Sequence, residues 1–189
     1  MLQKTLVALA ALIIGGALIY YLFDVEPKNT SSEVTSFEEC AALGNPVMES
    51  YPRQCRTRNG ELFVEHIGNE LEKNDLIRLD SPRPNAVIES PLEISGEARG
   101  YWFFEASFPV YLTNWDGLII SQWHATATGE WMTENFVPFT SLLDFESPYK
   151  EGDPDFFQIG TLILQKDNPS GLSEHDDALE IPVLFSPSN

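Results

Sequence analysis

The side chains best suited to chemistry gather in the stretch ESYPRQCRTRNGELFVE, at residues 49–65. It holds one of the chain's two cysteines, Cys55, together with three arginines, Arg53, Arg56 and Arg58. A cysteine beside arginines allows three interpretations: a reactive thiol, a binding site for an anionic partner, or a disulfide that closes a small fold. The elements around the stretch are needed to choose among them.

Those elements are predicted to be a short helix and a hairpin. Ser36 and Glu39 have the spacing of a capping box, in which each side chain bonds a free backbone donor of the other, so a helix is expected over residues 37–43. Asn59-Gly60 is typical of a two-residue hairpin turn with positive φ at both residues. The flanking strands are expected at residues 54–58 and 61–65.

Helix and hairpin together form a small module, residues 37–68, whose size favours a disulfide. Cys40 falls on the helix and Cys55 on the first hairpin strand. A module of this length buries too little apolar surface to fold alone. Closing the loop between the two cysteines restricts the unfolded chain by about 3 kcal/mol. We therefore predict a structural disulfide between Cys40 and Cys55 rather than a free reactive thiol.

The three arginines of the stretch are the only basic cluster in the chain. The simplest interpretation is that they pair with nearby acids such as Glu61 and Glu65. The second interpretation is recognition of an anionic partner, which makes Arg53, Arg56 and Arg58 candidate partner-binding residues.

Composition and motifs argue against several functions. A net charge of -18 repels polyphosphates, so no nucleic-acid partner is expected. His66, His124 and His175 lie in separate segments, without the spacing of zinc ligands. The acidic loop at residues 167–177 carries oxygen ligands that suit calcium, but Asn-Pro-Ser-Gly is ordinary turn chemistry. No catalytic residue, cofactor or metal site is predicted.

The first 23 residues predict a transmembrane anchor. Residues 5–23 carry no charge, and a helix of that length spans about 28 Å, close to one hydrocarbon core. Lys4 should stay in the cytoplasm, which places the C-terminal domains outside the membrane. The alternative is a signal peptide cleaved near Gly15-Gly16-Ala17. Residues 24–36 follow as a flexible linker.

A polar stretch at residues 69–76 is expected to be a second linker, and the pattern then changes to short strands broken by turns. About seven strands in residues 77–186 have the spacing of a two-sheet β-sandwich, so the fold class is all-β. Even-numbered residues from Phe104 to Leu112 should face one core.

Aromatic residues are dense in this domain, and most of them should belong to its core. Tyr101 and Trp102 follow Gly100 in an expected inter-strand loop. They could instead form an exposed patch for a partner or for glycan stacking, so both are candidate partner-binding residues.

Residues 77–186 resemble a known family, the immunoglobulin-like domain associated with bacterial spore germination proteins, which is the second of the GerMN-associated domains. The SP…SPL-x-I-x-G opening in IRLDSPRPNAVIESPLEISGEARG and the KDNPSG loop carry the resemblance. CAALGNPVMESYPRQC is similar to a short two-cysteine segment of the same kind of bacterial envelope protein. The resemblance implies a non-catalytic, extracytoplasmic domain used in protein–protein or envelope contacts.

Two functions follow as expectations. The preferred one is a membrane-anchored, non-enzymatic envelope protein whose immunoglobulin-like domain binds another protein or a cell-wall component. The alternative is an envelope enzyme or inhibitor that acts through the disulfide hairpin module.

Overall fold

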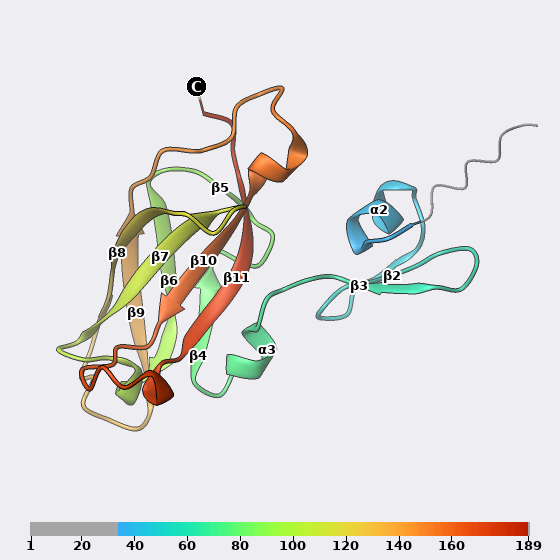
Figure 1. Ribbon diagram of the computed structural model, residues 1–189. Coiled ribbons are helices and arrows are strands. Elements are labelled where there is room, and N and C mark those ends of the chain that lie inside the picture. Colours follow the sequence, from blue (N-terminus) through green and yellow to red (C-terminus); the bar gives the residue numbers. More distant parts are fainter. Residues whose placement is uncertain (1–33, 189) are drawn as a thin grey trace, which may run out of the picture.

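The computed structural model describes residues 34–188 (Figure 1). The predicted anchor, residues 1–23, and most of the predicted linker at 24–36 lie outside the described residues. Within 34–188, no helix has the length and apolar character needed to cross a membrane.

The small module consists of one helix and a three-stranded antiparallel sheet. Ser36 caps the helix, because its Oγ accepts from the backbone N–H of Glu39 at 3.1 Å. The Glu39 carboxylate in turn accepts from the N–H of Thr35 at 2.8 Å, one residue before the position that a capping box predicts. The elements are α2 (Phe37–Ala42), β1 (Val47–Met48), β2 (Gln54–Arg56) and β3 (Leu62–Val64), in the sheet order β1-β2-β3.

The hairpin between β2 and β3 is wider than the sequence predicted. Gly60 has a φ of 92°, whereas Asn59 is not among the residues with positive φ. The N–H of Gly60 donates to the carbonyl of Thr57 at 3.0 Å, and the N–H of Thr57 donates to that of Glu61 at 2.9 Å. The expected two-residue turn is therefore wrong, and both strands are shorter than expected.

The rest of the chain forms one curled sheet of eight strands (Figure 1). Its order is β4-β6-β9-β8-β7-β10-β11-β5. β8 and β9 pair only through Thr126–Thr140 and Ala127–Phe139, so the sheet folds over at this junction and its two halves face each other as a sandwich. The seven predicted strands are present, and β5 is an eighth that pairs in parallel with the end of β11. The strands are β4 (Ile77–Ser81), β5 (Val87–Ile88), β6 (Leu92–Arg99), β7 (Ser107–Asn114), β8 (Ile119–Ala127), β9 (Phe136–Leu143), β10 (Ile159–Gln165) and β11 (Ala178–Phe185).

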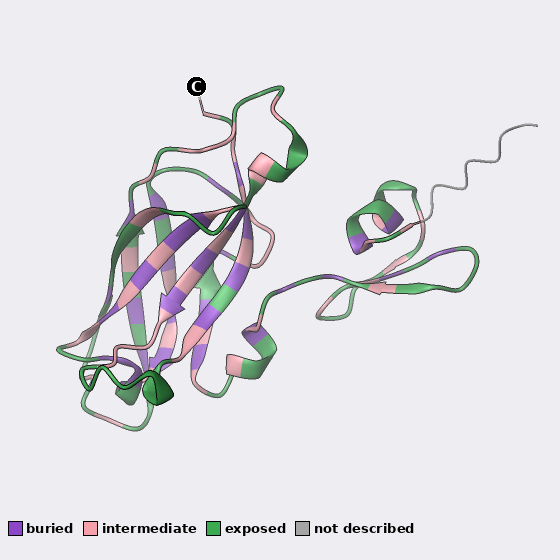
Figure 2. Cartoon of the chain, in the orientation of Figure 1, coloured by how far each residue is buried: buried purple, intermediate pink, exposed green. Residues whose placement is uncertain are grey.

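The core lies between the two halves of the sheet, where buried positions alternate with less buried ones along most of the strands (Figure 2). Phe108 is at its centre, with its ring 5.0 Å from that of Phe139. The expected run of even-numbered core residues begins only at Phe108, because Glu105 and Ala106 turn with positive φ and leave Phe104 exposed.

Four short helices connect the strands. They are α3 (Glu70–Lys73), η1 (Gly100–Trp102), η2 (Asp155–Gln158) and η3 (Ser173–His175).

The stretch 69–76, expected to be a linker, is bound to the sandwich through Asn69. The N–H of Asn69 donates to the carbonyl of Glu180 at 3.1 Å. Its side-chain amide donates to the carbonyl of Ala178 at 3.0 Å and accepts from the N–H of Glu180 at 2.8 Å. α3 follows directly and lies beside β4 and β11 (Figure 1).

Candidate binding surface

Cys40 and Cys55 form the predicted disulfide, with their Cα atoms 6.0 Å apart. Both are fully buried and, together with Phe37, make up the module's buried core. Val34, Val47 and Phe63 pack partly buried against them. So small a core leaves the disulfide as the main constraint on the module, as the sequence indicated.

Arg53 has a structural role within the module. Its guanidinium donates to the Glu65 carboxylate at 2.9 and 2.6 Å and lies 5.2 Å from the centre of the Phe37 ring. The hydrogen bond from Arg53 holds the pKa of the nearly buried Glu65 carboxyl below its usual value, against the opposing effect of burial. Pairing with a local acid, the simpler of the two interpretations, is the one that holds at Arg53.

Arg56 and Arg58 are both exposed near the hairpin turn. The only hydrogen bond from either side chain within 34–188 runs from Arg56 to the carbonyl of Gly60, at 3.3 Å. Arg53 is occupied by Glu65, so the structure does not bring the three arginines together as one anion-binding group.

A cluster of polar residues joins the module to the sandwich. Tyr51 donates its hydroxyl hydrogen to the Glu70 carboxylate, which also pairs with Arg83 at 2.8 Å. Burial raises the pKa of the Glu70 carboxyl, while the Arg83 guanidinium acts in the opposite direction. A second contact runs from the Asn85 amide to the Glu65 carboxylate at 3.2 Å. The two parts of the chain are therefore hydrogen-bonded to each other.

Tyr101 and Trp102, predicted as a possible exposed pair, lie in different environments. Tyr101 is 50% exposed, whereas Trp102 is fully buried in the sandwich core. The exposure proposed for Trp102 is wrong, because the side chain of Trp102 belongs to the buried core cluster of the sandwich. Its backbone carbonyl accepts from the N–H of Asp167, in the loop before η3, at 3.1 Å.

The acidic loop at residues 167–177 is arranged by its own hydrogen bonds. The Asn168 amide donates to the Asp176 carboxylate at 2.7 Å, and the Ser170 hydroxyl donates to the Asn168 side-chain oxygen at 2.6 Å. No group of three or more His, Cys, Asp or Glu residues in the described chain is arranged to hold a metal ion. Turn chemistry accounts for the arrangement of this loop.

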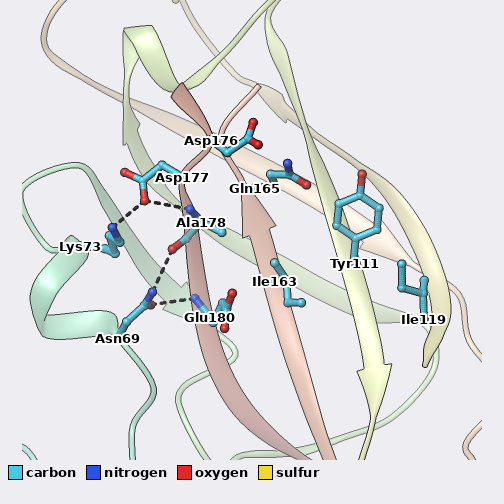
Figure 3. Close-up of a pocket in the computed structure, with 10 residues that line it drawn as sticks. All are labelled: Asn69, Lys73, Tyr111, Ile119, Ile163, Gln165, Asp176, Asp177, Ala178 and Glu180. Atoms are coloured by element: carbon cyan, nitrogen blue, oxygen red, sulfur yellow. Dashed lines mark hydrogen bonds and ion pairs between the residues drawn. The ribbon is translucent and has the colours of Figure 1, made fainter. Parts of the chain in front are cut away.

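The sequence analysis missed an open depression of about 720 Å³ on the outer face of the sheet (Figure 3). Its apolar floor is formed by Tyr111 on β7, Ile119 on β8 and Ile163 on β10. Register explains why they meet: Tyr111 and Ile163 are direct partners across the β7–β10 pairing. Tyr111 and Ile163 point away from the core, because residues 110, 112, 162 and 164 face inward, and Ile119 is 51% exposed.

One side of the depression is polar and mainly acidic (Figure 3). Asp176, Asp177 and Glu180 line it, and Lys73 of α3 pairs with Asp177 at 2.6 Å. Three carboxylates against one ammonium leave this edge negative. An apolar floor with a polar rim is the usual composition of a protein-binding surface.

A signal for this face exists in the sequence of β10. Leu162, Ile163 and Leu164 are consecutive apolar residues, so one of them must point out of a strand whose other face is core. Ile119 gives no comparable signal, because its face depends on the register shift between β7 and β8 at Leu112–Thr113.

The fold defines the class of the domain, an immunoglobulin-like β-sandwich. Residues 76–156 match the family model Gmad2, the immunoglobulin-like domain of bacterial spore germination. These residues therefore form a domain of this family, as the resemblance implied. The match ends before β10 and β11, which belong to the same sheet in the structure. Comparison with curated proteins and with solved structures gave no match.

Proposed function

We propose that this protein is a non-enzymatic component of the bacterial envelope, anchored by its N-terminal helix, whose immunoglobulin-like domain binds another protein or a cell-wall component outside the membrane. The observation that carries the binding role is the depression on the outer face of β8, β7 and β10. Exposed apolar side chains gathered on one sheet face are typical of interaction sites.

The anchor rests on the uncharged run at residues 5–23 and on Lys4 before it. The linker predicted at residues 24–36 follows this run, so the domain would be held outside the membrane on a short tether. The module is hydrogen-bonded to the sandwich at Glu65, and the stretch that follows the module is bound to the sandwich through Asn69, so both parts would be carried together on that tether.

The experiment compares two leucine-like side chains of equal exposure. Ile119 lies in the depression and Leu142 lies on β9, in the other half of the sheet, and each is 51% exposed. The full-length protein, expressed in its native envelope, is cross-linked to its neighbours and compared with Ile119→Ser and Leu142→Ser. We expect a cross-linked partner that is lost from Ile119→Ser and retained by Leu142→Ser.

Two outcomes would contradict the proposal. If both variants retain the same partners as the wild type, the depression is not the binding surface. If intact-mass measurement of membrane-extracted protein gives a mature N-terminus near Leu18, the segment is a cleaved signal and the anchor is wrong.

A further inference from the structure

A second exposed apolar group lies at one end of the sandwich, and it has the chemistry to select a partner. We call it the aromatic end patch and define it by Trp115, Leu118, Phe156, Phe157 and Ile159. The rings of Trp115 and Phe156 meet edge to face at 4.8 Å, and those of Phe156 and Phe157 stack at 4.7 Å. Trp115 is 46% exposed, so the cluster is assembled but open to solvent.

The patch is fixed by the backbone around it. The side-chain oxygen of Asn114 accepts from the N–H groups of Asp116 and Leu118 at 3.1 and 2.9 Å, which closes the turn that carries Trp115. Asn114 also pairs with Gly160 of β10, directly after Ile159. The turn and η2 therefore meet at the same end of the sheet, and the aromatic surface exists before any partner arrives.

The charge beside the patch is negative. Asp116 adjoins Trp115, and Asp155 is the first residue of η2. Neither carboxylate forms an ion pair with a described residue. The segment at residues 144–158 carries five carboxylates and one cation, Lys150. An anionic wall polymer would be repelled at this end, whereas a cationic segment would be attracted.

Other aromatic rings of the chain show how such a cation would bind. Arg78 and Arg99 each lie over the ring of Phe136, at 4.0 Å from its centre. Arginine also lies over Phe37 and Tyr51, but no cation of the described chain covers Trp115, Phe156 or Phe157. A cation over an aromatic face is attracted by the ring quadrupole, and Trp is the strongest such ring.

We propose that the aromatic end patch docks an arginine- or lysine-bearing segment of a partner protein, with a basic side chain over the exposed rings and Asp116 and Asp155 beside it. This inference rests on the proposed binding function and adds the chemistry of the partner. It concerns a part of the surface next to the depression, since Ile119 directly follows Leu118.

The test follows the indole N–H signal of each tryptophan in full-length protein labelled with ¹⁵N-tryptophan and held in detergent. The probe is a short glycine–serine peptide that carries three arginines, and the matched peptide has citrulline at each arginine. We expect the arginine peptide to shift the Trp115 signal and the citrulline peptide to bind about fivefold more weakly or worse. Raising the salt concentration should weaken the arginine peptide alone.

Two variants test whether the peptide binds to the aromatic end patch or to any exposed tryptophan. Trp115→Ala should weaken binding of the arginine peptide by about fivefold or more. Trp123→Ala is the matched control, since Trp123 is 60% exposed on β8 and outside the patch, and its affinity should stay within about twofold of the wild type. Unchanged signals from the remaining tryptophans show that each variant is folded.

Three results would overturn the inference: no shift at Trp115 with the arginine peptide, equal binding of the citrulline peptide, or an equal loss in Trp123→Ala. If a chito-oligosaccharide shifts Trp115 and the arginine peptide does not, the patch is a glycan site and the inference fails. The proposed function is tested separately. If Ile119→Ser loses its partner and Trp115→Ala has no effect, the proposed binding function stands and only the inference of a basic partner segment fails.

Discussion

Gly68 controls how the stretch after the module meets the sandwich, and replacing it should loosen that joint. Its φ is 70°, in the left-handed region that disfavours a side chain. A Cβ at this position would overlap the carbonyl oxygen of Glu180 and lie 2.9 Å from its carbonyl carbon. Gly68→Ala must therefore move the chain away from β11, whose backbone is the obstacle.

The magnitude follows from the hydrogen bonds that depend on this approach. Asn69 makes three with β11, at 3.1, 3.0 and 2.8 Å, and each is worth about 1 kcal/mol net. Their loss lowers the free energy of opening the joint by about 3 kcal/mol, in addition to about 1 kcal/mol for the left-handed backbone. Gly117→Ala is the control, because Gly117 has a φ of 77° and nothing within 4 Å of its added Cβ.

Hydrogen exchange at the amide of Asn69 measures this opening directly. We expect exchange in Gly68→Ala to be faster by up to about a thousandfold, with the sandwich core unchanged. Limited proteolysis should then cut at residues 69–73 in Gly68→Ala, while the wild type resists cutting there. Equal Asn69 protection in Gly68→Ala and Gly117→Ala would refute the reasoning, because the overlap with Glu180 would then have failed to open the joint.

Two further predictions concern the module. Cys55→Ser should remove about 3 kcal/mol of restriction on the unfolded chain and unfold residues 37–68, while NMR signals of residues 77–186 persist; a folded module in the variant would contradict this. Glu65→Gln should destabilise the module by roughly 1 kcal/mol at neutral pH, a small value because Arg53 is 47% exposed. The folded-state pKa of Glu65 is lowered, so its contribution is present above the unfolded pKa and is lost as the pH falls through the folded one. Urea unfolding should therefore show the wild type and Glu65→Gln converging in acid, and a difference that stays constant with pH would count against the Arg53–Glu65 pair.

Features encoded by neighbouring residues could be predicted from the sequence. The seven expected strands of the sandwich are present, because the alternation of apolar and polar residues is set within each strand, as in β6. The disulfide followed from the small size of the module. Trp102 could not be placed this way, because its burial depends on η1 and on a core built by strands from distant parts of the chain.

The same limit explains the surfaces. Arg53, Arg56 and Arg58 are close in sequence, yet Arg53 is fixed by Glu65 and does not join the other two. Tyr111, Ile119 and Ile163 are distant in sequence and come together only through the pairing of β7 with β8 and β10. Sequence proximity therefore identified candidates that the fold separates, and it missed a surface that the register creates.

The stretch at 69–76 shows why a polar composition is not sufficient evidence of a linker. β11 pairs with β5 only through Leu184 and Phe185, so its first half is an open edge on the side away from β10. Open edges carry unpaired backbone groups, which proteins cover to prevent pairing with other chains. Asn69 supplies a backbone donor, a side-chain donor and a side-chain acceptor to Ala178 and Glu180, 109 and 111 residues further along. A polar residue is required at that position, because an apolar side chain could not supply hydrogen bonds to the open edge of β11. The polar sequence of the segment therefore resembles that of an exposed linker, although the segment is bound to the sandwich in the fold.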